Sequence, residues 1–182
     1  MPAKPPEPTR IARLRLDRLP TPIGDALVLT DEDGLLRGLD WEDHEPRLRR
    51  LALRHYGDAE LVAGPAPLAV RRALGDYFAG DPAAIAALAW RTNGTAFQRS
   101  VWTALRDIPL GETLSYAGLA TRIGAPKAVR AVGLANGANP VGVVVPCHRV
   151  IGTNGSLTGY AGGLERKRWL LAHERAMLKA AA

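Results

Sequence analysis

The hydrophobic pattern of the chain changes near residue 92, and this change constrains the fold more than any other feature. Residues 11–41 alternate apolar and polar side chains, the period of half-buried strands, with turn residues at 21–24 and 31–34. They predict an antiparallel meander. Beyond residue 92, apolar residues recur at helical spacing. We therefore expect a mixed α/β (α+β) fold, with an antiparallel sheet and helices first and a mostly helical part second.

A turn-rich connection at Trp90–Thr95 coincides with this change of pattern. We place a domain boundary there, with one domain over residues 10–91 and the other over 92–182. Four prolines in the first nine residues favour extended backbone without amide donors, so residues 1–9 are predicted to be a disordered tail.

The two halves also differ in charge. Residues 1–90 carry 12 basic and 14 acidic side chains, net −2, whereas residues 91–182 carry 12 basic and only 4 acidic ones, net +8. A half this positive suggests a polyanion as its partner.

Several classes of site are excluded by composition. The single cysteine forbids an internal disulfide, and with four scattered histidines it cannot form a recognisable zinc cluster, so we predict no metal. The glycine-rich segment 159–163 lacks the spacing of a phosphate-binding loop, so no nucleotide cofactor is indicated. No stretch approaches the about 20 apolar residues of a membrane span, and the first residues do not resemble a signal peptide. We expect a soluble, cytoplasmic protein that does not bind membranes.

Two short helices in the basic half predict a helix-turn-helix. Ser115 is a good N-cap for a helix to Ile123, and Gly124 permits a sharp reversal. A second helix is expected from Pro126 to about Gly137. Such a pair is typical of DNA-binding proteins, although ordinary helix packing gives the same pattern.

The candidate recognition helix, Lys127–Asn136, consists mainly of small residues around one long side chain, Arg130. Small residues such as Ala131 and Gly133 would let the helix press into a groove while Arg130 is inserted, as in base-displacing proteins. Tight packing against a neighbouring helix explains the same small residues equally well.

Cys147 follows the apolar run Val141–Val145, which predicts a buried strand that ends at Pro146. A thiol needs a base to react at neutral pH, and His148 could act through a water or at a bend. Glu174 is the natural group to orient that histidine, because acidic residues are scarce in this half. The alternative is that Cys147 is a small buried hydrophobe and that Glu174 pairs with a surface arginine.

These residues form part of a longer pattern that covers about residues 93–175 in order and spacing. Its motifs are Gly94-Thr95, Phe97-Gln98, Val101-Trp102, Ile108-Pro109, Gly111-Glu112-Thr113, Ser115-Tyr116, Arg130-Ala131-Val132-Gly133, Asn139-Pro140, Pro146-Cys147-His148-Arg149-Val150, Gly159-Tyr160-Ala161-Gly162-Gly163 and Trp169-Leu170-Leu171 leading to His173-Glu174. The pattern resembles the O6-alkylguanine-DNA alkyltransferases, also called methylated-DNA–protein-cysteine methyltransferases.

The resemblance implies roles for the catalytic residues. Cys147 would be the nucleophile and the permanent alkyl acceptor, activated through a water by His148, which Glu174 orients. Tyr116 would donate a hydrogen bond or a proton to the guanine ring as its oxygen leaves. Asn139 would brace the helix pair and the active-site segment.

The same resemblance implies a set of DNA and base contacts. Arg130 would fill the space that the flipped nucleotide vacates, on a helix inserted into the minor groove with Ala131 and Gly133 at the DNA. Backbone groups around Cys147, Val150 and Ala161 would read the base edge. The pocket wall would be shaped by two further residues, Tyr160 and Gly162.

The implied function is DNA repair by a single-turnover transfer of a methyl or other alkyl group from O6 of guanine in duplex DNA, with no cofactor. The resemblance also implies a ribonuclease H-like fold for the N-terminal domain and a monomer. Activity on O4-alkylthymine and cooperative binding along DNA stay open. Some family members carry zinc in the N-terminal domain, but this chain has no cysteine other than Cys147, so we predict no such metal. A non-enzymatic branch of the family lacks the reactive cysteine. This chain retains Cys147, so we assign it to the active branch.

Two other functions are compatible with the residues alone. The first is a helix-turn-helix protein that binds alkylated DNA without chemistry. The second is a hydrolase with a Cys-His-Glu triad, although a hydrolase does not need a groove-binding helix that carries Arg130.

Overall fold

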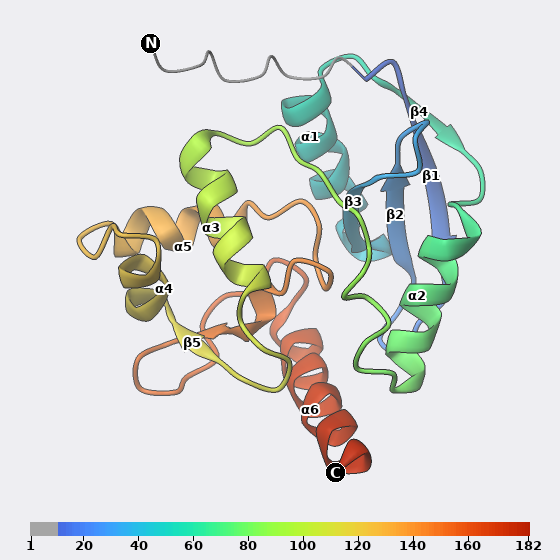
Figure 1. Cartoon of the computed structure of the whole chain (residues 1–182). Helices are drawn as coiled ribbons and strands as arrows, with labels where there is room; N and C mark the ends of the chain where they lie inside the picture. The colour runs from blue at the N-terminus through green and yellow to red at the C-terminus, as the bar shows by residue number, and fades with distance from the viewer. Residues whose placement is uncertain (1–10) are drawn as a thin grey trace.

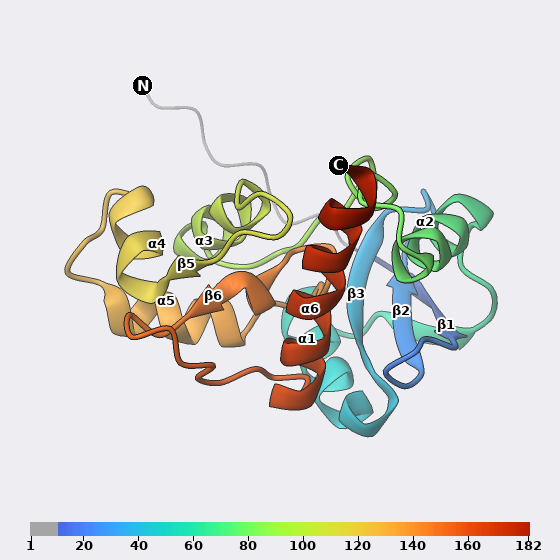
Figure 2. The same cartoon turned by 90° about the horizontal axis from the view of Figure 1, so that it is seen from below.

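The computed structural model describes residues 11–182, so the predicted tail at residues 1–9 lies outside the described part. A twisted sheet forms one side of the molecule and the helices of the basic half form the other (Figure 1). Figure 2 shows the last helix, drawn in red, between these two parts. The predicted mixed fold is confirmed.

The sheet has the strand order β3-β2-β1-β4. Its strands are β1 (Arg13–Leu19), β2 (Ala26–Thr30), β3 (Leu36–Trp41) and β4 (Glu60–Ala63). The first three pair antiparallel, which confirms the predicted meander, and β4 adds a parallel strand beside β1. The sequence did not predict β4, because it is four residues long and only partly buried.

Alternate residues of β2 face two different hydrophobic layers, as the pleat of a strand requires. Leu27 and Leu29 pack with α1 (Glu45–Tyr56), which follows the short 3-10 helix η1 (Glu42–His44). Val28 faces the opposite layer together with α2 (Leu68–Ala79). Both faces of the sheet are therefore covered.

The basic half consists of helices and two very short strands. Its elements are α3 (Ala96–Arg106), β5 (Leu114–Ser115), α4 (Tyr116–Arg122), α5 (Val129–Gly137), η2 (Cys147–Arg149), β6 (Val150–Ile151) and α6 (Leu164–Ala181). Thr95 and Gln98 form a reciprocal capping box at the start of α3. The predicted cap of α4 is confirmed, because the Ser115 hydroxyl accepts a hydrogen bond from the Gly118 N–H at 2.9 Å.

The second helix of the pair begins later than predicted. Residues 125–128 form a turn, closed by a hydrogen bond from the Ala128 N–H to the Ala125 carbonyl at 2.8 Å, and α5 starts only at Val129. The prediction that Pro126 begins the helix is wrong, because the fixed φ of proline suits a turn as well as a first helical turn. Lys127 therefore lies before the helix, whereas Arg130 lies in its first turn.

The predicted strand Val141–Val145 is also wrong. The segment is buried, but it folds into turns in which the Val145 N–H bonds the Val141 carbonyl at 2.9 Å. Val143 has a φ of 67°, which a strand does not allow. The β-branched apolar run correctly indicated burial, and burial alone does not distinguish a strand from a packed turn. Cys147 consequently begins η2 and does not end a strand.

The two halves meet along β3. The Leu39 N–H bonds the Pro140 carbonyl at 2.8 Å, and the Leu39 carbonyl accepts from the Gly142 N–H at 3.0 Å. One hydrophobic cluster includes side chains of the sheet, α2 and the basic half. The sheet thus supports the turn segment that leads to Cys147. Over residues 11–182, none of the helices has the length and apolarity to cross a membrane.

Candidate active site

Cys147 is held at the start of η2 by Asn139. The Asn139 Nδ2 donates to the Val145 carbonyl at 2.8 Å, and its Oδ1 accepts from the Val141 N–H at 3.0 Å, so one side chain fixes both ends of the buried turn. Burial raises the pKa of the Cys147 thiol, and the Asn139 amide beside it acts in the opposite direction. The thiol therefore needs a base in order to react.

His148 and Glu174 form a fully buried pair. His148 Nε2 lies 2.8 Å from Glu174 Oε1, and both side chains are 0% exposed. The same carboxylate accepts two hydrogen bonds from Arg149, both at 2.9 Å, and one from the Tyr77 hydroxyl at 2.9 Å. Burial alone would raise the pKa of Glu174, but His148 and Arg149 outweigh it and hold that pKa well below its ordinary value. Glu174 is therefore an anion at neutral pH.

This pairing defines how His148 can act. An anionic Glu174 accepts a hydrogen bond, so His148 carries its proton on Nε2 and leaves Nδ1 as the basic nitrogen. His148 Nδ1 is buried and has no hydrogen-bond partner among the described residues. It is therefore the ring nitrogen available to receive a proton.

A cavity of about 230 Å³ opens onto Cys147. Its lining combines the start of α4, one face of α5, the first residue of η2 and the loop before α6, namely Tyr116, Gly133, Asn136, Gly137, Cys147, Gly159, Tyr160 and Ala161. The Tyr116 hydroxyl donates to the Thr158 carbonyl at 3.1 Å, and burial raises the pKa of Tyr116, so it stays a protonated donor. Burial likewise raises the pKa of Tyr160 well above its ordinary value.

Four predicted site residues lie around this cavity without lining it. Asn139 and His148 are buried behind Cys147. Val150, in β6, pairs with Leu114 of β5. Gly162 is buried against Trp41, and a Cβ added to Gly162 would lie 2.5 Å from the indole nitrogen. Gly162 thus allows the close packing that positions Tyr160, since the same Cβ would lie 2.7 Å from its ring.

Two further predicted residues, Arg130 and Ala131, are exposed on the outer face of α5, the helix that carries Gly133 on the cavity side. Glu174 is also outside the cavity, where its carboxylate contacts His148 Nε2.

Sequence reasoning missed Lys167, Arg149 and Tyr77. Lys167 is fully buried, and its Nζ donates to the carbonyls of Val150, Thr158 and Gly159 at 2.6, 3.2 and 3.2 Å. It therefore ties the loop over the cavity to the segment that follows Cys147. Nothing in the sequence distinguishes this lysine from its exposed neighbours on α6.

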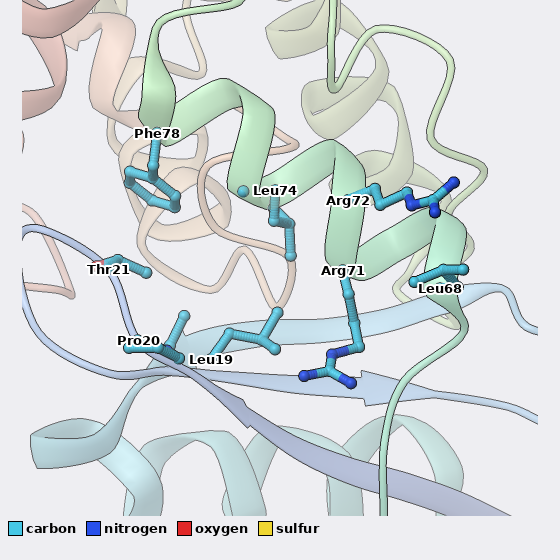
Figure 3. Close-up of a pocket in the computed structure, with 10 residues that line it drawn as sticks. Leu19, Pro20, Thr21, Leu68, Arg71, Arg72, Leu74 and Phe78 are labelled. Carbon is cyan, nitrogen blue, oxygen red and sulfur yellow. The ribbon is translucent and has the colours of Figure 1, made fainter.

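A larger cavity, of about 380 Å³, lies away from Cys147 between α2 and the end of β1 (Figure 3). Leu19 and Pro20 form one wall, and Leu74 and Phe78 project from α2 toward them. The lining of this cavity includes two arginines, Arg71 and Arg72, and the hydroxyl residue Thr21, but no cysteine, histidine or carboxylate. In the described part of the chain, no three His, Cys, Asp or Glu side chains are grouped so as to hold a metal ion.

The fold and the site together define a class of protein, in which a buried cysteine beside a His–Glu pair opens to a cavity formed in part by α5, the second of two short helices joined by a turn. Residues 96–176 match the family model described as 6-O-methylguanine DNA methyltransferase, DNA binding domain. The chain is 50% identical to a methylated-DNA–protein-cysteine methyltransferase of Salmonella typhimurium over 168 residues, which cover 91% of this chain and 98% of the relative.

Two further comparisons agree. A protein of the same name from Methanosarcina acetivorans is 42% identical over 85% of this chain and 94% of the relative. A solved structure of Mycobacterium tuberculosis OGT in complex with DNA is similar with a TM-score of 0.73 and 38% identity, over 90% of this chain and 94% of that chain. The chain belongs to the methylated-DNA–protein-cysteine methyltransferase family.

Proposed function

We propose that the protein repairs DNA by moving a methyl or other alkyl group from O6 of guanine in duplex DNA to Cys147, once per molecule. The observation that carries this proposal is the buried cysteine at a cavity, backed by a His148–Glu174 pair with one free ring nitrogen. Family membership supports the same reaction. A protein that only bound alkylated DNA would not need this buried pair.

The step balances without a cofactor. The Cys147 proton passes through a water to His148 Nδ1, and the thiolate attacks the alkyl carbon in line with the C–O6 bond. The S–C bond forms, the C–O6 bond breaks, and the electron pair stays on the guanine, which Tyr116 stabilises by donating a hydrogen bond or a proton. The thioether product is not hydrolysed by any pair in the cavity, so the protein reacts once.

The basic half supplies the DNA contacts in this proposal. A guanine in a duplex must rotate out of the stack to reach the cavity, at a cost of a few kcal/mol. Arg130 and Ala131, exposed on α5, would enter the minor groove, where Arg130 fills the vacated space. The net charge of +8 on residues 91–182 would offset part of the cost through phosphate contacts.

Replacing Tyr116 by phenylalanine should slow methyl transfer roughly a hundredfold, because the ring stays in the cavity wall while its proton donor is lost. The measurement is the single-turnover rate on a duplex oligonucleotide with O6-methylguanine. Affinity for the same duplex serves as the control and should change little. An unchanged rate would remove Tyr116 from the chemistry.

Replacing Arg130 by alanine should reduce transfer from the duplex at least tenfold and leave transfer from the free base O6-methylguanine unchanged, since only the duplex requires base flipping. Arg175→Ala is the matched control, because it removes the same charge from an exposed position on α6. Equal losses in the two variants would show that Arg130 contributes only general electrostatics.

Five further points stay proposals. We propose that residues 10–91 and 92–182 are separate domains, that the N-terminal one supports the site and has a ribonuclease H-like fold, and that the protein binds DNA as a monomer. A cytoplasmic location follows from the proposed substrate, because the protein must share a reducing compartment with DNA.

A further inference from the structure

Tyr77 belongs to the N-terminal half, yet it contacts the buried His148–Glu174 pair, and the reaction above gives it no role. It lies near the end of α2, is 0% exposed, and donates from its hydroxyl to Glu174 Oε1 at 2.9 Å. Burial, together with the charge of Glu174, raises the pKa of Tyr77 well above its ordinary value. The hydroxyl therefore keeps its proton and is a permanent donor to this carboxylate.

The two oxygens of Glu174 carry unequal numbers of hydrogen bonds. Oε1 accepts from the Tyr77 hydroxyl, from His148 Nε2 at 2.8 Å and from Arg149 Nη2 at 2.9 Å. Oε2 accepts from Arg149 Nε at 2.9 Å. A carboxylate oxygen has about two lone-pair sites, so the three donors on Oε1 must share them. The hydroxyl of Tyr77 thus competes with His148 for the same acceptor.

Tyr77 is held against α6 by a second contact. His173 precedes Glu174 on α6, and its Nε2 donates to the backbone carbonyl of Tyr77 at 2.8 Å. The rings of Tyr77 and His173 also meet edge to face, with their centroids 5.5 Å apart. α2 therefore contacts two successive residues of α6, and this fixes the hydroxyl of Tyr77 relative to the carboxylate.

We propose that Tyr77 is a positioning residue of the alkyl transfer, supplied by the N-terminal half, which limits how strongly Glu174 draws on the Nε2 proton of His148. This inference rests on the proposed function. Without the hydroxyl, Oε1 becomes a better acceptor for His148, and a protonated ring is favoured. The neutral ring, which can receive the Cys147 proton, is then formed only at higher pH.

Other titratable or charged groups also lie near the pair. From the elements packed around it these are Cys147 and Arg149 of η2, Arg106 of α3, Tyr160 of the loop before α6, and Lys167 and His173 of α6 itself. Replacing Tyr77 by phenylalanine alters none of these side chains and keeps the aromatic ring. A change in pH dependence is therefore assigned to the lost hydroxyl.

The test is the single-turnover rate of methyl transfer as a function of pH, measured at saturating duplex with O6-methylguanine so that DNA affinity does not enter. In Tyr77→Phe the midpoint of the acid limb should move up by roughly half a pH unit, which is an about threefold slower transfer well below the midpoint. The plateau rate at higher pH should change little, because Arg149 still holds the carboxylate.

Tyr56→Phe is the matched control. Tyr56 is also a buried tyrosine of the N-terminal half, but its hydroxyl donates to the Arg37 carbonyl at 2.9 Å and does not contact Glu174. This variant loses a buried hydrogen bond of the same kind and should keep the unaltered midpoint. Thermal unfolding of both variants measures any loss of stability. Tyr77→Met, whose flexible side chain adapts to the space, repeats the comparison if the phenylalanine variant does not fold.

An unshifted midpoint in the Tyr77 variant, or an equal shift in the Tyr56 variant, would overturn the inference. A lower plateau rate without a shift would overturn it as well, because it would show a purely structural role. The same comparison can be made without alkylated DNA, by following the ¹⁵N resonances of the His148 ring against pH. No transfer to the unaltered protein at any pH would contradict the proposed function, and the ring resonances would still decide the role of Tyr77.

Discussion

Replacing Cys147 by alanine should reduce methyl transfer to the background level while DNA affinity changes little. The chain contains no other thiol, and no other cavity residue offers a comparably soft nucleophile for an alkyl carbon. The sulfur is buried, so its loss removes no group that the exposed face of α5 presents to DNA. The measurements are transfer of labelled methyl from a duplex oligonucleotide and the dissociation constant for the same duplex.

This variant also separates the main proposal from its alternative. A non-catalytic protein that binds alkylated DNA would protect cells against methylating agents equally well with alanine at residue 147. Full protection by Cys147→Ala would therefore contradict the transfer mechanism. Cells that express Cys147→Ala should instead be as sensitive as cells without the protein.

Replacing Glu174 by leucine should destabilise the folded protein by about 3–5 kcal/mol, because it leaves the Arg149 guanidinium buried without its counter-ion. Arg149 would keep only its hydrogen bond to the Ile108 carbonyl at 2.6 Å. Denaturant unfolding measures the change. Glu165→Gln is the matched control on the same helix, since its ion pair with Arg168 is exposed and should contribute less than about 1 kcal/mol.

The same carboxylate should make stability depend on pH. Because the pKa of Glu174 is lower in the folded than in the unfolded state, its contribution is present above the unfolded value of about 4.3 and is lost as pH falls below it. The unaltered protein should lose more stability than Glu174→Gln as the pH is lowered from about 5 toward 3. Parallel curves for the two proteins would contradict the depressed pKa.

The sequence predicted the parts of the site that belong to local motifs. Cys147 and His148 are adjacent in the chain, and the scarcity of acidic residues indicated Glu174, which lies against His148 in the structure. The meander and the start of α4 were predicted because alternation and capping act within a few residues.

Other features depend on tertiary contacts and could not be predicted. The segment Val141–Val145 is buried by β3 as a turn, with Val143 in the left-handed region, whereas its composition favours a strand. Lys167 and Asn136 look like ordinary helix-surface residues in the sequence. Only the packing of α6 under the loop before it, and of α5 against α3, shows that these two side chains are buried.

The most direct test of the central claim is the mass of the intact protein after it is mixed with a duplex oligonucleotide that contains O6-methylguanine. We predict that each molecule gains a single methyl group, that peptide mapping places it on Cys147, and that excess oligonucleotide adds no more. A methyl group on any other residue, or repair of more lesions than there are protein molecules, would contradict the account.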